Sequence, residues 1–491
     1  MSSGNDSVSL SGARSIRDLP GPPPLPLLGN SLQLNRQSMH QTLEEWSRKY
    51  GDTFRFRIAL QEYLVISNRD MVMAVLRDRP DGFRRSSKSV RVARELGPDG
   101  VFTANGEAWK RQRRMVQSGL DPAHVKAFFP TLVKVTDRLA RRWQRAAATN
   151  EDIDLQSDLM RYTVDVTAGL AFGSDINTLE SREEVIQLHL DKVLPAVFKR
   201  LVAAVPYWRY VKLPSDRQLD RHVAALRTAV QGFISEARLR LEQHPELKVE
   251  PSNLIEAMLV ARDAADSQLT DEDLIGNTLT MLLAGEDTTA NTLAWAIWLL
   301  HRHPESLEQA RREAQSLLGT DSYPTGHEQL SHLHFIEACL SEAMRVKPVA
   351  PILVLEAGRD SVVGNVQVPA GTPVICLMRP AATDAQSFLD PWAYRPERWL
   401  QGRGIGEMDA AARRVVMSFG AGPRLCPGRY LAIAEMKMVI AMLLQGFEIQ
   451  TVATPDGGEP RERLGFTMWP VGLRMHLRER EASIPGHSRA N

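Results

Sequence analysis

The longest helical segment that the sequence predicts runs from residue 271 to residue 303, about 33 residues. It begins after Thr270, which can cap the helix together with Asp273 at the third position, and it ends before Pro304. At 1.5 Å per residue such a helix is about 50 Å long. A helix of that length crosses a whole domain, so we expect the remaining elements to pack around it.

The rest of the chain is also mostly helical, with a smaller β component. Alternating apolar and polar residues over 53–67 predict a β-hairpin. Strand-like segments also lie near 352–356, 362–368 and 373–377. Further helices are predicted at 106–149, 157–171, 183–200, 215–243, 252–263 and 333–346. We expect a mainly α fold with minor β (α+β), as a single large domain over residues 19–480, with disordered tails at 1–18 and 481–491.

Composition narrows the class of protein. The 491 residues are 43% hydrophobic, enough for a large core, and 60 basic against 59 acidic residues give a net charge of +1. This balance does not favour a nucleic-acid partner. Cys339, Cys376 and Cys426 are scattered, which argues against a disulfide framework and a zinc site and fits a reducing compartment. We recognise no signal peptide or transmembrane segment and expect a soluble, cytoplasmic protein.

The stretch SFGAGPRLCPGRYLAIAEMKMV, residues 418–439, places Cys426 between a glycine-rich loop and a helix. Gly420 and Gly422 allow a positive φ or a close approach to a flat ligand, and Pro427 fits the first helical position. The positive end of the helix dipole lowers the pKa of a thiol at such a helix N-terminus. We therefore expect a thiolate that binds a soft or borderline metal; the alternative for a single cysteine is a buried, inert thiol.

The centre of the long helix carries LLAGEDTTANTL, residues 282–293. A glycine costs about 1 kcal/mol in a helix interior, and threonine competes for backbone carbonyls. Such residues indicate a site in which Asp287 offers an acid and Thr288 a hydroxyl, while Ala284 and Gly285 give room for a planar cofactor. The alternative is a kink that packing tolerates.

The loop FGAGPRLCPGR, residues 419–429, resembles the haem-binding signature of the cytochrome P-450 family of haem-thiolate monooxygenases, Phe-x-x-Gly-x-Arg-x-Cys-x-Gly. The fixed positions are matched by Phe419, Gly422, Arg424, Cys426 and Gly428. The resemblance, to a soluble, bacterial-type member, implies a cytochrome P-450-like domain with one haem b per chain. It also implies that Cys426 binds the iron and that Phe419, Gly420, Arg424 and Gly428 contact the cofactor.

Further motifs of this family stand in the expected order along the chain. EAMR places Glu342 and Arg345 one helical turn apart, and PERW at 396–399 supplies Arg398. By resemblance these residues form a structural triad that fixes the loop carrying Cys426. Taken alone, such a pair is more often a solvated surface ion pair.

GEAWKRQRR, residues 106–114, resembles the motif on the helix that meets the haem propionates. It implies that Trp109 and Arg113 donate to these carboxylates; the alternative is a basic helix face that binds an acidic redox protein. Many family members carry a basic residue on the strand after the triad helix, where this chain has the apolar Leu355 or the acidic Glu356. We therefore expect Arg424, Trp109 and Arg113 to carry more of the propionate binding.

The sequence AGEDTT, residues 284–289, resembles the oxygen-activation motif of the family. By resemblance, Thr288 is the alcohol and Asp287 the acid of a catalytic pair that delivers protons. Ala284 and Gly285 then let the helix lie flat against the haem.

The resemblance implies a monooxygenase that inserts one oxygen atom from dioxygen into a hydrophobic organic substrate, by hydroxylation or epoxidation. About 65 residues follow Cys426, too few for a fused flavin reductase, so we expect electrons from a separate ferredoxin or flavodoxin with its reductase. The alternatives are a peroxide-driven peroxygenase, which does not need Asp287 and Thr288, and a non-catalytic haem-thiolate sensor. By resemblance the pocket for a substrate, whose identity stays open, is walled by 84–104, 196–211, 281–289, 350–355 and the turn near Thr467 and Met468.

Overall fold

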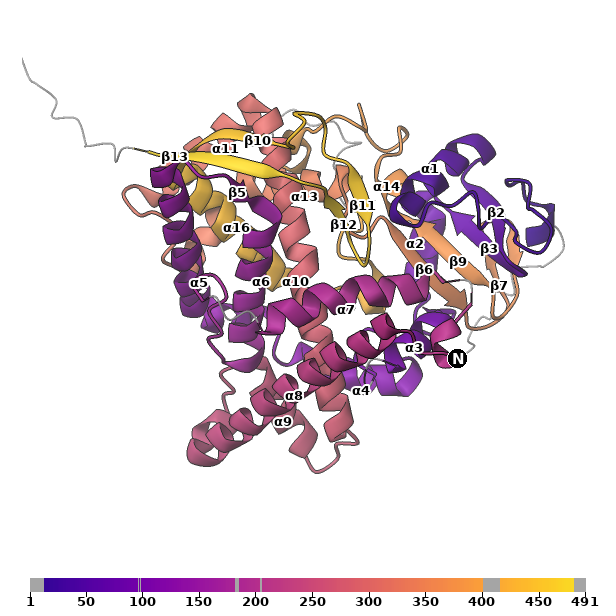
Figure 1. Ribbon diagram of the computed structural model, residues 1–491, viewed down its shortest axis with the longest axis horizontal. Coiled ribbons are helices and arrows are strands. Elements are labelled where there is room, and N and C mark those ends of the chain that lie inside the picture. The colour runs from indigo at the N-terminus through magenta and orange to yellow at the C-terminus, as the bar shows by residue number, and fades with distance from the viewer. Residues whose placement is uncertain are drawn as a thin grey trace, which may run out of the picture.

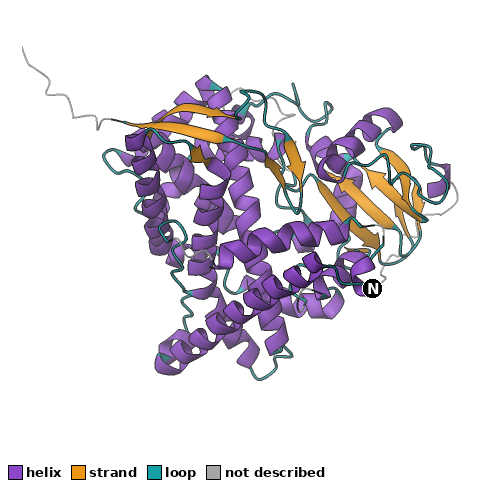
Figure 2. Ribbon diagram, in the orientation of Figure 1, coloured by secondary structure: helices purple, strands orange, loops and turns teal. Residues whose placement is uncertain are grey.

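The computed structural model describes residues 13–95, 97, 99–181, 185–203, 205–400 and 416–480. Helices make up most of this body, and one long helix, α10, runs through its middle (Figure 1). The largest sheet lies at one side of the helical part (Figure 2). The mainly α fold with minor β is confirmed.

The helices lie along most of the chain. The α-helices are α1 (Met39–Tyr50), α2 (Arg69–Arg77), α3 (Ser87–Arg94), α4 (Gly106–Gln117), α5 (Pro122–Thr149), α6 (Leu155–Phe172), α7 (Val185–Leu201), α8 (Pro214–Gln243), α9 (Leu254–Asp263), α10 (Asp271–Arg302), α11 (Pro304–Leu318), α12 (His327–His332), α13 (His334–Val346), α14 (Met378–Ala382) and α16 (Arg429–Gly446). Short 3₁₀ helices are η1 (Ile16–Asp18), η2 (Arg36–Ser38), η3 (Tyr207–Arg209), η4 (Pro245–Lys248), η5 (Pro396–Trp399) and η6 (Gly422–Arg424).

The long helix α10 forms as the sequence predicts. The Thr270 hydroxyl accepts from the Asp273 backbone N–H, and the Asp273 carboxylate accepts from the Thr270 backbone N–H, which closes a capping box. His303 and Pro304 end the helix. The second half of α10 is buried, with Trp295 fully enclosed, because other helices pack around it. The helix is therefore the central support of the fold.

Four sheets are described. The strands are β1 (Arg14–Ser15), β2 (Thr53–Ile58), β3 (Gln61–Ile66), β4 (Phe83–Arg85), β5 (Ile153–Asp154), β6 (Ile352–Ala357), β7 (Ser361–Val363), β8 (Val366–Val368), β9 (Pro373–Leu377), β10 (Phe447–Ala453), β11 (Glu462–Leu464), β12 (Met468–Pro470) and β13 (Arg474–Glu479). The largest sheet has the order β2-β3-β9-β6-β4, and the smaller ones are β10-β13-β5, β1-β8-β7 and β11-β12. The predicted hairpin at 53–67 is the antiparallel pair β2–β3.

Two predicted elements are each divided in the structure. The segment 106–149 forms α4 and α5, because Asp121 caps a new helix and Pro122 takes its first position. The segment 362–368 forms β7 and β8, since Gly364 adopts a φ of 59° and turns the chain. Each break comes from a residue that favours a turn or a cap.

The ordered part of the chain begins before residue 19. Strand β1 pairs in parallel with β8, and Ile16 is buried, so the end of the expected N-terminal tail belongs to the fold. Its register, Arg14 opposite Val366, is a long-range pairing that local sequence does not reveal. The predicted C-terminal tail, 481–491, lies outside the described residues.

The buried side chains form two cores. The larger lies among the helices around α10, and the smaller lies between the largest sheet and α2, with Leu64, Leu76 and Val374 among its members. Within the described ranges, no helix is both long and apolar enough to cross a membrane.

Candidate functional site

The loop before α16 holds Cys426 in a folded turn. The Cys426 backbone N–H donates to the Phe419 carbonyl at 2.9 Å. Gly420 and Gly422 have φ values of 78° and 68°, as expected for glycine. A Cβ at Gly422 would lie 2.6 Å from the Leu76 carbonyl oxygen, so this glycine lets the loop approach α2. The glycines therefore set the position of the cysteine.

Helix α16 starts later than the sequence predicts. It begins at Arg429 with Gly428 as its cap, so Pro427 is not the first helical residue and Cys426 precedes the helix. Burial raises the pKa of the Cys426 thiol, although the Gly428 backbone N–H, Arg113 and Arg429 act in the opposite direction. Burial of the sulfur thus opposes the thiolate that the sequence predicts, and the thiolate stays a prediction. Coordination to a metal ion deprotonates a thiol outright.

Four arginines, which we call the arginine cluster, gather near this loop: Arg79 after α2, Arg85 at the end of β4, Arg113 on α4 and Arg424 in η6. Burial lowers the pKa of Arg79 to about 10 and that of Arg424 to about 9. Burial also lowers the pKa of Arg85 and of Arg113, and the neighbouring arginines lower the pKa of Arg85 and Arg424 further. Like charges this close raise the free energy of the folded chain unless anions lie among them.

Several donors of the arginine cluster have no hydrogen-bond partner within the described part of the chain. They are Nε and Nη2 of Arg79, Nε of Arg113, and Nε and Nη1 of Arg424, all buried. The Arg424 guanidinium also lies 4.5 Å from the centre of the buried Trp109 ring. Buried guanidinium donors without acceptors suit a ligand that carries carboxylates. These residues therefore fit the propionates of a haem, with the Cys426 sulfur available for its iron.

Arg85, on the strand next to Leu355, supplies a basic side chain at this edge of the candidate site. Strand β4 pairs with β6, and the register places Arg85 directly opposite Leu355. The two positions share one face of the sheet, so the arginine comes from the neighbouring strand. Sequence reasoning missed Arg79 and Arg85, because the pairing of 85 with 355 is long-range. The run FRR at 83–85 was the only local signal.

The centre of α10 presents the two predicted catalytic residues in different surroundings. Ala284 and Thr288 are half-buried, and the Thr288 hydroxyl donates to the Ala284 carbonyl at 2.8 Å. Asp287 is buried; its Oδ1 accepts from Asn291 Nδ2 at 2.7 Å, and its Oδ2 accepts from the Thr467 hydroxyl. Sequence reasoning missed Asn291 and Thr467 as partners of this acid, although Asn291 stands one helical turn beyond it.

Gly285 lies where helix α10 packs against helix α6. A Cβ at this position would lie 2.6 Å from Thr167 Oγ1 and 3.1 Å from Thr167 Cγ2. Thr167 belongs to α6, which packs closely along α10, so the glycine permits helix–helix packing. The helix is continuous from Asp271 to Arg302. Gly285 therefore permits close packing of α6 on α10; that it also makes room for a cofactor stays a prediction.

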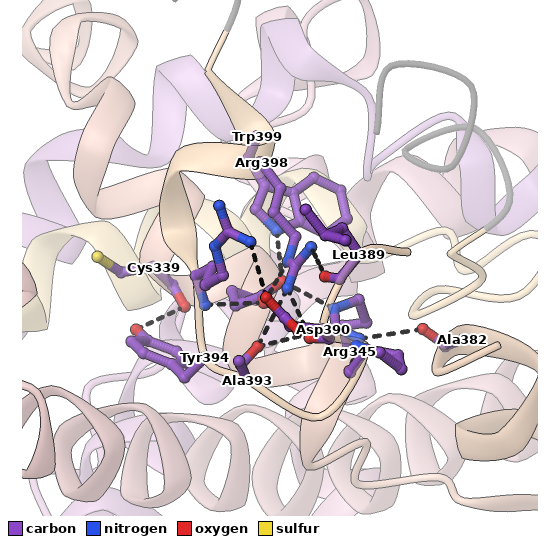
Figure 3. A network of polar contacts seen from close by, with 12 residues as sticks. Cys339, Arg345, Ala382, Leu389, Asp390, Ala393, Tyr394, Arg398 and Trp399 are labelled. Carbon is purple, nitrogen blue, oxygen red and sulfur yellow. Dashed lines mark hydrogen bonds and ion pairs between the residues drawn. The ribbon is translucent and has the colours of Figure 1, made fainter. Parts of the chain in front are cut away.

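Glu342, Arg345 and Arg398 form one buried ion-pair network (Figure 3). Arg345 donates through Nε to Glu342 Oε2 at 2.8 Å and through Nη2 to Oε1 at 2.7 Å. Arg398 Nε donates to Oε1 at 3.0 Å, and Trp399 Nε1 donates to Oε2 at 2.9 Å. All three charged side chains are at most 2% exposed. The alternative of a solvated surface pair is excluded.

The remaining donors of this network hold the segment between α14 and η5. Arg345 donates to the carbonyls of Ala382 and Ala393 at 3.2 and 3.0 Å. Arg398 donates to the carbonyls of Leu389 and Asp390 at 2.6 and 2.8 Å, as Figure 3 shows. The described contacts of the triad therefore hold residues 382–393; that the triad also fixes the Cys426 loop stays a prediction.

The segment 196–211 comprises the end of α7, a loop and η3. Trp208 donates through Nε1 to Glu95 at 2.6 Å and is buried, whereas Tyr210 is 82% exposed. A cavity of about 320 Å³ lies under this segment, lined by residues that include Arg36, Arg200 and Trp208. Among the described residues, no three His, Cys, Asp or Glu side chains gather as a metal site.

Comparison with known proteins places the chain in a family. The model of the family described as Cytochrome P450 matches residues 19–476. A self-sufficient cytochrome P450 monooxygenase of Aspergillus niger is 27% identical over 96% of this chain and 44% of its own length. Cytochrome P450 27C1 of Danio rerio is 28% identical over 89% of this chain and 82% of its own length.

A longer bacterial relative is also similar. The bifunctional cytochrome P450/NADPH–P450 reductase 2 of Bacillus subtilis is 26% identical over 95% of this chain and 43% of its own length. The chain thus spans less than half the length of the A. niger and B. subtilis relatives. The family match covers nearly all of the described residues, including the Cys426 loop, the triad and the centre of α10. The chain belongs to the cytochrome P450 family.

Proposed function

We propose that this chain is a haem-thiolate monooxygenase that inserts one oxygen atom from dioxygen into a hydrophobic organic substrate, by hydroxylation or epoxidation. The family implies haem b, one per chain, as the cofactor. The observation that carries the proposal is the set of buried, unpartnered arginine donors beside Cys426. That set matches a ligand with an iron atom and carboxylates, because Arg113, a member of the arginine cluster, lies close enough to the Cys426 sulfur to lower its pKa.

The residues that would hold the cofactor come from distant parts of the chain. Cys426 would bind the iron, and the arginine cluster with Trp109 would bind the propionates. Phe419, Gly420 and Gly428 would shape the loop against the cofactor, and Ala284 and Gly285 would give it room beside α10. When bound, a thiolate-ligated haem activates dioxygen for attack on unactivated C–H bonds.

Asp287 and Thr288 are the proposed acid and alcohol of proton delivery. Thr288 is half-buried, and its hydroxyl can exchange the Ala284 carbonyl for another acceptor by rotating about χ1. Asp287 is buried and keeps its carboxylate on fixed donors, so it holds a proton acceptor one residue away from that hydroxyl. A peroxygenase or a sensor does not need this pair, which favours the monooxygenase.

Electrons are proposed to come from a ferredoxin or flavodoxin with its reductase. The relative from B. subtilis is named as a cytochrome P450 joined with a reductase, so the form of the partner is part of the proposal. Arg111, Arg114 and Arg429 are candidates to contact an acidic partner, whereas Lys110 pairs with Glu107 at 2.6 Å. A cytoplasmic location likewise stays a prediction.

The spectrum of the ferrous carbon monoxide complex tests the ligand. We expect the haem-loaded chain to absorb at the long wavelength that a thiolate imposes, and we expect Cys426→Ser to lose this band. Cys339→Ala and Cys376→Ala are matched controls, because both sulfurs are buried and free and neither belongs to the proposed site. A wild-type band at the position of imidazole-ligated haem would contradict the proposal.

The reaction itself is tested in two steps. First, hydrophobic compounds are titrated against the haem-loaded chain, and a shift of the Soret band identifies a substrate class. Second, turnover under ¹⁸O₂ must place one labelled atom in the product. In Thr288→Ala, the ratio of hydrogen peroxide released to product formed should rise about tenfold or more, because reducing equivalents are diverted from product to peroxide. Unchanged coupling in this variant would remove the proposed role of Thr288, and product formed only with added peroxide would favour the peroxygenase.

A further inference from the structure

The Asp287 carboxylate is the end point of an ordered set of side-chain hydrogen bonds. Gln156 Nε2 donates to Asn291 Oδ1 at 2.9 Å. Asn291 Nδ2 then donates to Asp287 Oδ1 at 2.7 Å and to Thr467 Oγ1 at 3.0 Å. The Thr467 hydroxyl donates to Asp287 Oδ2. The described hydrogen bonds therefore run from Gln156 through Asn291 and Thr467 to the Asp287 carboxylate.

The direction of these bonds is fixed by the chemistry of the groups. A hydroxyl has one proton, so Thr467, which accepts from the Asn291 amide, is left to donate its own proton to the acid. The Asn291 amide is oriented by Gln156, which can only donate to the oxygen of that amide through its NH₂ group. Donors on both oxygens stabilise the ionised form of a carboxylate and prevent its rotation.

Thr467 belongs to a turn that the rest of the fold holds in place. It lies between β11 and β12, and it is 2% exposed. The Gly465 backbone N–H donates to the Thr467 carbonyl, and the Met468 backbone N–H donates to the Val349 carbonyl, both at 2.8 Å. The preceding residue, Phe466, has its ring centre 5.9 Å from that of Phe102. The hydroxyl is therefore presented by a rigid turn and not by the helix that carries the acid.

We propose that Thr467 and Asn291 are positioning residues that keep the Asp287 carboxylate ionised and oriented for proton delivery. The inference rests on the proposed role of Asp287. Thr467 joins the C-terminal turn to the acid of α10, so a displacement of this turn changes the proton-delivery step. Asn291 sets the polarity of the network from within the helix.

The test uses the haem-loaded chain with a surrogate ferredoxin and its reductase, and measures the fraction of the consumed reducing equivalents that is recovered as hydrogen peroxide. Proton delivery by Asp287 lowers this fraction, so the fraction is expected to rise at acid pH as Asp287 becomes protonated. Thr467→Val, which removes the hydroxyl and keeps the shape, should raise the apparent pKa of this acid limb by about one to two units. Thr467→Ser should restore the wild-type profile.

Controls separate positioning from general damage. Thr278→Val removes another buried hydroxyl on α10, one that donates to the Leu274 carbonyl at 2.8 Å, and should leave the limb unmoved. The thermal unfolding midpoint and the carbon monoxide spectrum of each variant show whether folding and the sulfur ligand are intact. Asn291→Asp changes the polarity of the network and should also move the limb.

The outcomes distinguish the two proposals. If Asp287→Asn keeps the acid limb, the proposed acid–base role of Asp287 fails, and the positioning role fails with it. If Asp287→Asn abolishes the limb but Thr467→Val leaves it unshifted, the positioning inference alone is wrong. A shift in Thr467→Val that Thr467→Ser reverses supports it.

Discussion

Replacement of Gly285 by alanine tests whether this glycine of the α10 motif permits packing against α6 or makes room for the cofactor. The added Cβ would lie 2.6 Å from Thr167 Oγ1, 3.1 Å from Cγ2 and 3.4 Å from Cβ of the same residue. Overpacking of this kind costs about 1–3 kcal/mol, whereas exchange of glycine for alanine in a helix interior gains about 1 kcal/mol. We expect Gly285→Ala to lower the free energy of unfolding by about 0–2 kcal/mol.

A second substitution tests the cause of that loss. Thr167→Ala removes both atoms closer than 3.4 Å to the added Cβ, and the lost hydroxyl has no hydrogen-bond partner among the described residues. In this background Gly285→Ala should become stabilising by about 1 kcal/mol, which gives a coupling energy of about 1–3 kcal/mol between the two sites. The assay is urea unfolding of the four proteins of the double-mutant cycle, with and without haem.

One outcome of the double-mutant cycle would refute the packing of Gly285 against Thr167. Effects of the two substitutions that add within about 0.5 kcal/mol would mean that Gly285 does not pack against Thr167. If Gly285→Ala instead weakened haem retention equally in both backgrounds, without loss of stability, the original expectation of a cofactor-facing glycine would hold.

Three further changes have expected outcomes. Arg85→Leu should stabilise the haem-free chain, because one cation leaves a cluster of like charges, and should speed transfer of haem to apomyoglobin several-fold; equal stability and equal transfer would contradict the cluster. Glu342→Gln leaves two buried guanidinium groups without their carboxylate and should lower the free energy of unfolding by about 3–5 kcal/mol in a denaturant titration. Burial raises the pKa of Glu435 well above 4.5, so as pH rises the unfolded chain releases this proton before the folded chain does. The free energy of unfolding therefore falls by about 1.4 kcal/mol for each pH unit of increase between the pKa of Glu435 in the unfolded chain and its pKa in the folded chain. Glu435→Gln should therefore be more stable than the wild type at pH 7, with the difference shrinking as pH falls toward 4.5; a difference independent of pH would be inconsistent with the buried, protonated acid.

The sequence predicted those parts of the fold that local chemistry determines. The capping box of α10, the hairpin β2–β3 and the positive φ of Gly420 each depend on residues a few positions apart. The break between α4 and α5 was not predicted, although Asp121 and Pro122 together mark a helix start. Strand β1 was not predictable, because its partner lies about 350 residues away.

The same division applies to the candidate site. The motifs identified Cys426, Asp287, Thr288 and the triad because each motif is contiguous or lies on one helix. They could not reveal Arg85, or Thr467 as the partner of Asp287, because these places are set by strand register and by a turn from the other end of the chain. They also did not reveal that Gly285 packs against Thr167, because a missing Cβ does not indicate which neighbour needs the space.

The triad and the arginine cluster both bury guanidinium groups, but they differ in how many of the buried nitrogens have a hydrogen-bond acceptor. The guanidinium groups of the triad find a carboxylate and several carbonyls, and none of their buried nitrogens lacks a partner among the described residues. The arginine cluster leaves five buried nitrogens without one in the same part of the chain. Burial of unpaired guanidinium donors costs several kcal/mol, so a fold that retains them gains from an anion that binds there. Because the Trp109 ring lies against the Arg424 guanidinium, the place also suits an anion that carries an apolar body, as haem does.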